Sequence, residues 1–275
     1  MKKLSVEVRC DMKWRNAKAL QARDVLALWP KPGVDDDKYS RGVVGIDSGS
    51  ERFPGAAVLN VLGALWSGAG FIRYVGTPAA KPALLLQAPS ITYGGGRVQA
   101  WCLGSGWDEA EDNVARLQMR LKDGVPCVLD AAALLLLRDG AFGKLPDGSL
   151  LTPHVGELAR LLAVKPEQVK EHPAEYALQA AKATGATVLL KGALQYAAAP
   201  DGAVLRALRG PAWTAQAGSG DVLAGICATL LAAGIEALLA GALAASIQAM
   251  MALEHPGPIP PDALLRYLPE TITAS

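Results

Sequence analysis

The sequence has almost no charge imbalance and few aromatic side chains, and both shortages limit what the protein can do. Its 275 residues include 27 Lys and Arg against 26 Asp and Glu, a formal net charge of +1. This balance argues against a nucleic-acid or membrane-surface partner recognised through bulk charge. Aromatic residues make up 5% of the chain, whereas hydrophobic residues, mainly Ala, Leu and Val, make up 51%. This composition is typical of a helix-rich, tightly packed soluble protein.

Cysteine is also scarce, because the chain has only Cys10, Cys102, Cys127 and Cys227. No two of them have metal-ligand spacing, and nothing in their placement indicates a disulfide framework. Cys102 and Cys127 lie in apolar runs that predict strands, so we expect buried thiols there. A reducing cytoplasm is the simplest location for such a chain.

The chain lacks an apolar run long enough to cross a membrane. Its first residues resemble the start of a signal peptide, but charged residues at positions 7, 9, 11, 13 and 15 leave no apolar segment after them. Between residues 222 and 253, Glu236 separates charge-free runs of 14 and 17 residues. A span needs about 18–20 apolar residues. We expect two buried helices joined near Gly234 and no membrane partner.

Strand-like and helix-like segments alternate from residue 42 onward. A short buried strand at 43–46, a helix that begins at Pro54 and a strand at 71–75 make a first βαβ unit. The alternation continues with strands at 98–103, 125–129 and 187–190 and helices at 108–123, 155–162 and 173–184. The pattern predicts an α/β fold with a mainly parallel central sheet covered by helices on both faces. We expect one domain over residues 1–275, with 1–40 as a polar N-terminal extension and an acidic loop at 35–37.

Polar residues follow the predicted strands at the point where each strand ends. They are Ser48, Gly104 to Gly106, Asp130, His154 and Lys191. The carboxyl ends of parallel strands meet at one edge of a sheet, where ligands of open α/β proteins bind. Asp201-Gly202 predicts a hairpin turn between two further strands.

The most informative segment is Gly218-Ser219-Gly220-Asp221, which an apolar helical run follows at once. Unpaired N–H groups at a helix N-terminus favour a phosphate. An acid at this place is explained if it takes the proton of an alcohol that attacks the phosphate. The alternative is an Asp that only stabilises the start of the helix. The segment therefore predicts phosphoryl transfer to a hydroxyl.

Together with this turn, several segments resemble one family, the ADP/ATP-dependent NAD(P)H-hydrate dehydratases of the ribokinase-like superfamily. The matching segments are residues 48–50, 53–57, 67–70, 104–106, 151–157, 190–193 and 218–225. Thr-Pro-His-x-Gly-Glu at 152–157, taken with Pro-Gly-Ala-Ala at 54–57, is the most specific part. The resemblance implies repair of a hydrated nicotinamide ring: its C6 hydroxyl is phosphorylated, and loss of phosphate restores NAD(P)H with AMP (from ADP) or ADP (from ATP).

The resemblance also implies a role for each matching residue. Asp221 is the catalytic base and touches the substrate; Ala56, Gly106 and His154 bind the substrate; Gly218, Ser219 and Gly220 hold the phosphate; and Lys191, Gly192, Ala193, Leu194 and Gln195 bind the adenine nucleotide. A side chain at Gly218 or Gly220 is expected to crowd the anion. Plainer alternatives stand beside these roles, namely a surface lysine, a structural histidine and close helix–sheet packing at the small residues. Glu157 serves the first helical turn or a bound ion, and Asp130 serves the metal–phosphate side or a cap.

Cofactor, assembly and two departures complete the expectations. ADP or ATP is the phosphoryl donor, and Mg²⁺ is implied by phosphate chemistry without a ligand pattern. About 40 residues precede the first predicted strand, so we expect the dehydratase without an epimerase domain. The resemblance implies a homo-oligomer, a tetramer, in the cytoplasm. Relatives often have an acid at Ala132 and His-Gly at Gln248-Ala249. The alternatives are a small-molecule kinase of this superfamily, acting on a vitamin precursor or sugar, or a nucleotide-binding module without catalysis.

Overall fold

The central sheet is continuous and mostly parallel. The computed structural model describes residues 17–108, 112–137 and 144–273. Within them, ten strands form one sheet. In spatial order they are β1 (Lys18–Ala19), β10 (Val204–Arg206), β9 (Tyr196–Ala198), β8 (Thr187–Leu190), β7 (Leu150–Leu151), β6 (Cys127–Leu129), β5 (Ala100–Leu103), β2 (Val43–Asp47), β3 (Phe71–Tyr74) and β4 (Thr92–Tyr93).

Pairing is parallel from β8 to β4, and β9 runs antiparallel to both β8 and β10. The β9–β10 hairpin turns at Asp201-Gly202, as the sequence predicts, and Gly202 has φ +108°. The helices are α1 (Ala22–Leu28), α2 (Pro54–Trp66), α3 (Lys81–Gln87), α4 (Asn113–Leu121), α5 (Ala132–Leu137), α6 (Val155–Leu162), α7 (Pro166–Glu171), α8 (Pro173–Thr184), α9 (Ser219–Ala232), α10 (Ala237–Glu254), α11 (Pro261–Leu264) and α12 (Leu268–Thr273).

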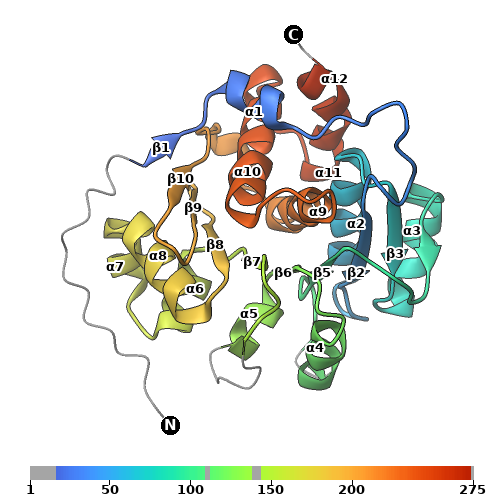
Figure 1. The fold of residues 1–275 in the computed structure, drawn as a ribbon, viewed down its shortest axis with the longest axis horizontal. Helices are drawn as coiled ribbons and strands as arrows, with labels where there is room; N and C mark the ends of the chain where they lie inside the picture. The colour runs from blue at the N-terminus through green and yellow to red at the C-terminus, as the bar shows by residue number, and fades with distance from the viewer. Residues whose placement is uncertain (1–16, 109–111, 138–143, 274–275) are drawn as a thin grey trace.

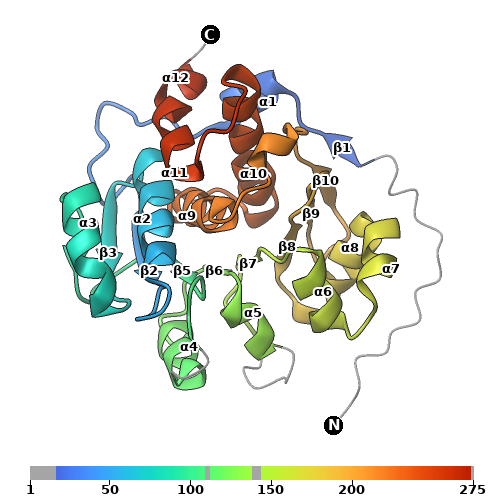
Figure 2. The ribbon, with the colours of Figure 1, turned by 180° about the vertical axis from the view of Figure 1, so that it is seen from behind.

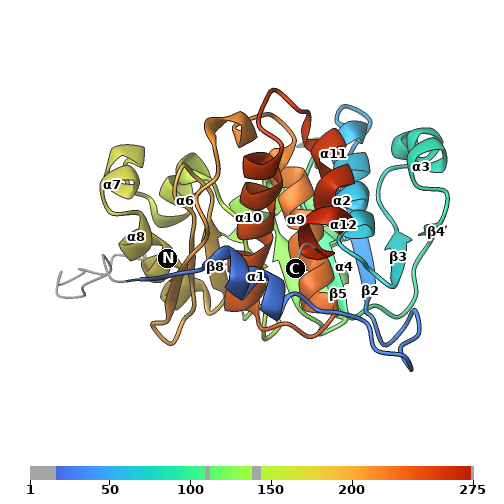
Figure 3. The same ribbon diagram turned by 90° about the horizontal axis from the view of Figure 1, so that it is seen from above.

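Helices cover both faces of the sheet, which confirms the predicted fold class. α2, α9 and α10 lie on one face, and α4, α5, α6 and α8 lie on the other (Figure 1; seen from behind in Figure 2). Two separate apolar cores result, one on each face. The view from above shows α11 and α12 lying outside α2 and α10 (Figure 3).

α2 and α9 approach each other closely, and two glycines permit it. A Cβ atom at Gly63 would overlap the Val222 carbonyl, and one at Gly225 would overlap the Asn60 carbonyl. Any larger residue at either position would push the helices apart. This contact fixes the N-terminal turn of α9 against α2, and that turn carries Asp221.

The two Ala-rich helices are buried as expected. α9 and α10 are joined at Gly234, which has φ +82°. By length and composition α10 could cross a membrane, but 72% of its apolar window is buried inside the fold. Its apolar character is therefore explained by its position in the core.

Several predicted boundaries are wrong, most clearly near the N-terminus. The sequence predicts no strand or helix before residue 42, yet β1 pairs with β10 and α1 packs on α10. The strands predicted at 98–103 and 125–129 are shorter, beginning at Ala100 and Cys127, and α4 begins only at Asn113. Cys102 and Cys127 are buried thiols, as predicted, and so is Cys227, whereas Cys10 lies outside the described residues.

Candidate active site

The polar residues singled out in the sequence meet at one edge of the sheet. β2, β5, β6, β7 and β8 are mutually parallel neighbours, so their carboxyl ends lie side by side. Ser48, Gly104, Asp130, His154 and Lys191 follow these strands, and a parallel bridge links His154 to Lys191. The predicted clustering is confirmed.

Asp130 is a buried acid of this edge whose two carboxylate oxygens accept three side-chain hydrogen bonds. Its Oδ1 accepts from the Lys191 Nζ at 2.7 Å and from the Thr152 Oγ1 at 2.8 Å. Its Oδ2 accepts from the Ser105 Oγ at 2.9 Å. The donors come from the ends of β8, β7 and β5, so Asp130 links three strands.

Asp221 lies in the first turn of α9, close to this cluster. Asn60 of α2 donates to the Asp221 carbonyl at 2.7 Å and to the Ser105 Oγ at 3.3 Å, which ties the turn to the sheet edge. Burial and, next in size, the charge of Asp130 raise the pKa of Asp221 to about 7, although Lys191 and a hydrogen bond from Ser105 act in the opposite direction. A carboxyl group with this pKa suits a general base that works near neutral pH.

The glycine turn ahead of Asp221 leaves backbone donors free. Gly218 precedes the helix with φ +89°, in the left-handed region that favours glycine. The first hydrogen bond of the helical i to i−4 type runs from the Val222 N–H to the Gly218 carbonyl. Among the described residues, the N–H groups of Gly220 and Asp221 have no acceptor. Two unpaired N–H groups at a helix start form an anion subsite.

Contacts within the protein also favour glycine at these two positions. A Cβ atom at Gly218 would lie 2.6 Å from the Leu59 Cδ1, and one at Gly220 would lie 3.1 Å from the Lys191 Nζ. Gly220 therefore lets the Lys191 ammonium group approach the turn. The Ser219 hydroxyl points back, donating to the Gln216 carbonyl at 2.6 Å or to the Thr214 carbonyl at 2.9 Å, so in this structure it braces the turn.

A cavity of about 400 Å³ opens beside this turn. Among the residues predicted to bind nucleotide, it is lined by Lys191, Gly192, Ala193, Gln195, Ser219 and Gly220. Leu194 and Gly218 do not line it. The Gln195 Oε1 is buried without a hydrogen-bond partner among the described residues, so it is available to a ligand donor. Across the cavity, residues 208–212 and Thr214 and Ala215 complete the wall.

His154 lines the same cavity and also begins α6. Its Nδ1 accepts from the N–H groups of Gly156 at 3.0 Å and Glu157 at 3.2 Å, and the Glu157 Oε2 accepts from the His154 N–H at 2.7 Å. This reciprocal pair is a capping box. The first-turn role of Glu157 is thus confirmed. The His154 side chain is 61% exposed, and its Nε2 lies 3.6 Å from the Glu157 Oε1.

Ala56 and Gly106, predicted to bind substrate, touch each other away from that cavity. A Cβ atom at Gly106, which has φ +68°, would lie 2.6 Å from the Ala56 Cβ and 3.2 Å from the Gly49 Cα. Close packing therefore requires small residues at both positions, and their role in substrate binding stays a prediction. They follow β2 and β5, whereas Lys191 follows β8. Asp130 follows β6, which lies between β5 and β8 in the sheet, and Asn60 ties Asp221 to Ser105.

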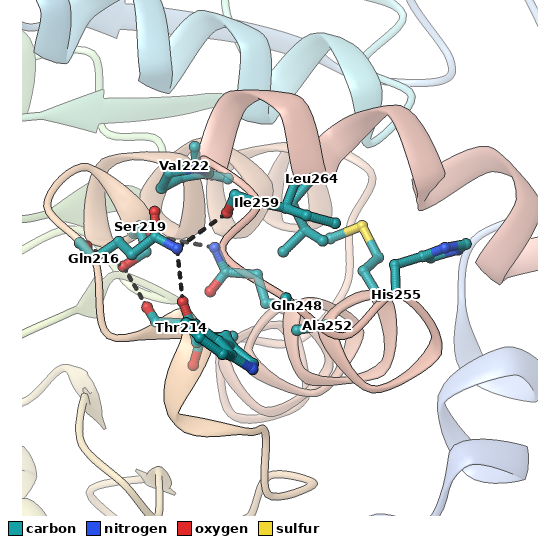
Figure 4. Close-up of a pocket in the computed structure, with 13 residues that line it drawn as sticks. Thr214, Gln216, Ser219, Val222, Gln248, Ala252, His255, Ile259 and Leu264 are labelled. Carbon is teal, nitrogen blue, oxygen red and sulfur yellow. Dashed lines mark hydrogen bonds between the residues drawn. The ribbon is translucent and has the colours of Figure 1, made fainter.

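A second, small void of about 20 Å³ lies behind the turn (Figure 4). There the Gln216 Nε2 donates to the Ile259 carbonyl at 3.1 Å, and the Gln248 Nε2 donates to the Ser219 carbonyl at 3.0 Å. Gln248 lines the larger cavity as well. Gln248, at the position of the departure, therefore makes a polar link between α10 and the start of α9.

Two groups of residues were missed in the sequence. Asn60 lies on the buried side of α2, an otherwise apolar helix. The only sign of its role in the sequence is this single amide residue among apolar ones. Asp47, at the end of β2, is fully buried and binds both the Arg116 Nε at 2.6 Å and the Arg120 Nε at 2.7 Å. This pairing joins β2 to α4. It cannot be recognised in the sequence, because the partners are far apart along the chain.

No group of three or more His, Cys, Asp or Glu suited to a metal occurs among the described residues. Residues 17–108, 112–137 and 144–273 thus offer no metal cage made of these side chains alone. Magnesium in phosphoryl-transfer sites is held largely by substrate phosphates and water, with few protein ligands, so this donor set fits an ion that arrives with a nucleotide.

The fold defines the class: it is ribokinase-like, and a solved structure of a ribokinase-like superfamily protein from Enterococcus faecalis matches it with a TM-score of 0.83. A family model described as NAD(P)H-hydrate dehydratase matches residues 44–270, and the chain belongs to this family. The family predicted from the sequence is confirmed.

Known proteins support the same family. The bifunctional NAD(P)H-hydrate repair enzyme Nnr of Mycobacterium tuberculosis is 39% identical over 239 residues, covering 84% of this chain and 49% of the relative. The chain thus spans about half the length of the first relatives it matches. The ADP-dependent (S)-NAD(P)H-hydrate dehydratase of Xanthomonas campestris is 34% identical, covering 78% of this chain and 81% of the relative. A crystal structure of the ADP/ATP-dependent NAD(P)H-hydrate dehydratase of Bacillus subtilis, co-crystallised with ATP/Mg²⁺, has a TM-score of 0.83 at 25% identity, covering 93% and 98% of the two chains.

Proposed function

We propose that this protein dehydrates the hydrated nicotinamide ring of NAD(P)H hydrate at the expense of ADP or ATP. The observation that carries the proposal is the order of groups along the sheet edge. The cavity is lined by Lys191, which follows β8, and by Gly220, whereas the Ala56–Gly106 contact joins α2 to the end of β5, three strands away from β8. Asp221 adjoins Gly220 and is tied through Asn60 to Ser105, beside Gly106. A phosphoryl donor and a hydroxyl acceptor bound on these two sides would meet at Asp221.

In this reaction the C6 hydroxyl oxygen attacks the terminal phosphorus of the nucleotide. A P–O bond forms to the substrate, the P–O bond to the leaving nucleotide breaks, and Asp221 accepts the hydroxyl proton. Departure of phosphate then breaks the C6–O bond, and loss of a C5 proton restores the ring double bond. The products are NAD(P)H, phosphate and AMP (from ADP) or ADP (from ATP).

The protein's contribution is position and charge. The free N–H groups of Gly220 and Asp221 would hold the transferred phosphoryl group, and the Lys191 ammonium group beside them would offset its charge. Bound Mg²⁺ would supply charge neutralisation between the phosphates. His154, which lines the nucleotide cavity beside Lys191, would contact the substrate where the two ligands meet.

We further propose one domain for residues 1–275, a cytoplasmic location and a homo-oligomer. Balanced charge and three buried free thiols support the location. The strand and helix within the first 40 residues support their assignment to the same domain. The resemblance to the family supports a tetramer.

The test is incubation of the protein with hydrated NADH and either ADP or ATP, followed by the recovery of NADH absorbance. We expect recovery with at least one nucleotide and release of phosphate in equal amount. Asp221→Asn should reduce the rate by about 10²-fold or more, because the base is lost while the cavity residues stay. Dinucleotide binding by the variant should stay near the wild-type level.

Two outcomes would contradict the proposal. A stable phosphate ester formed without NADH recovery would indicate a small-molecule kinase, and nucleotide binding without any turnover would indicate a module that has lost catalysis. Full activity of Asp221→Asn would remove Asp221 from the mechanism.

A further inference from the structure

Asp130 is a buried acid that the proposed reaction does not use. Its side chain is 3% exposed, and it is absent from the wall of the nucleotide cavity. Both carboxylate oxygens are occupied, by the donors of Lys191, Thr152 and Ser105. A carboxylate with this many donors is fixed in one orientation, so its charge has a defined position.

Three acidic side chains surround Lys191, and the one with which it forms an ion pair determines where its ammonium group lies. Asp130, Glu157 and Asp221 all act on its charge, and together they outweigh burial and raise the pKa of Lys191. Among the described residues only Asp130 lies within ion-pair distance, at 2.7 Å. The ammonium group is therefore held on the side of Asp130, against Gly220 and clear of a pair with Asp221.

We propose that Asp130 is a positioning residue that keeps the Lys191 ammonium group away from Asp221 and acts on Asp221 through its own negative charge. This inference rests on the proposed function, in which Asp221 accepts a proton and Lys191 meets a phosphate. A direct Lys191–Asp221 pair would defeat both roles, because it would hold the base as an ion-paired carboxylate and occupy the cation.

The charged groups that face Asp221 come from three elements besides its own helix. Asp130 follows β6 and Glu157 belongs to α6, and both raise the pKa of Asp221; Lys191 follows β8 and lowers it. Replacing Asp130 by asparagine removes the larger of the two repulsions and frees Lys191 to turn toward Asp221. Both effects lower the pKa of Asp221.

The test is a titration of the Asp221 carboxyl group by carbon-13 NMR in protein without nucleotide or substrate, with the signal assigned by its loss in Asp221→Asn. In Asp130→Asn we expect the Asp221 midpoint to fall by about one pH unit or more. Asp47→Asn is the matched control, because Asp47 is an equally buried acid at the same sheet edge whose charged partners are Arg116 and Arg120. It should leave the Asp221 midpoint in place.

A second variant keeps the test decisive if Asp130→Asn fails to fold. Lys191→Met removes the opposing charge, so the Asp221 midpoint should rise. An unchanged midpoint in Asp130→Asn, or a fall in Lys191→Met, would overturn the inference. Because no substrate is present, the result is independent of dehydratase activity. Failure of the proposed function would show instead in the NADH recovery assay.

Discussion

Replacing Asp221 by asparagine should make the folded protein more stable at alkaline pH while it stops turnover. The site holds Asp221 where its charged form is disfavoured, since burial and then the charge of Asp130 raise its pKa from 3.8 to about 7. A residue kept for catalysis under such conditions weakens the fold. The size and the pH dependence of that weakening follow from the same two values.

The sign follows from proton binding. Between pH 3.8 and about 7 the folded protein binds a proton on Asp221 that the unfolded chain has released. The stability linked to this group is fully present below pH 3.8 and is lost as the pH rises through about 7. A difference of about three pH units corresponds to about 4 kcal/mol above that range.

The Asp221→Asn variant should recover part of this lost stability. An amide at position 221 still has to leave water, which costs about 2 kcal/mol. We therefore expect Asp221→Asn to be more stable than the wild type by about 2 kcal/mol at about pH 9. At about pH 5 most of the wild-type penalty is gone, so the advantage should shrink by about 2–3 kcal/mol and vanish or reverse.

Urea unfolding followed by tryptophan fluorescence measures both differences, since the chain has six Trp residues. Asp47→Asn provides the contrast at a second buried acid. It removes the carboxylate that Arg116 and Arg120 both bind, so it should cost about 3 kcal/mol or more at either pH. An Asp221→Asn variant that is less stable than the wild type at about pH 9, or a difference that ignores pH, would refute the reasoning.

Three further predictions concern the helix crossing, the base and the cation. Gly225→Ala should lower stability by about 1–3 kcal/mol in thermal unfolding, because its methyl group would overlap the Asn60 carbonyl, whereas Gly55→Ala, with open space around it, should not. The kcat/KM for the hydrate should fall on the acid side of about pH 7, where Asp221 is protonated, and a flat acid limb would exclude it as the base. Lys191→Arg should weaken ADP binding in calorimetry less than Lys191→Met does, because arginine keeps the positive charge but not the compact ammonium group that lies against Gly220 and pairs with Asp130.

The parts of the fold that the sequence predicted depend on local pattern. The alternation of short apolar runs with helical periods is read within a few residues, so β2, α2, β3, α8 and β8 begin and end close to where they were expected. Parallel order then places every strand end at one edge. The position of Asp130, His154 and Lys191 follows from those two facts without any side-chain detail.

The parts that failed depend on contacts between distant residues. Asn60 donates to the carbonyl of a residue 161 positions later, and Asp47 binds an arginine 73 positions later. No local pattern records such partners. The strand β1 was missed for the same reason, because its two residues become a strand only through pairing with β10.

The chemistry of Lys191 explains why a single lysine can serve both the empty and the loaded site. An ammonium group has three donors, and Asp130 takes one of them at 2.7 Å. The remaining two are free to meet a phosphate held by the N–H groups of Gly220 and Asp221, so nucleotide binding does not have to break the buried pair. In the proposed reaction Asp130 would therefore keep its partner, and its repulsion of Asp221 would persist while the phosphate is bound.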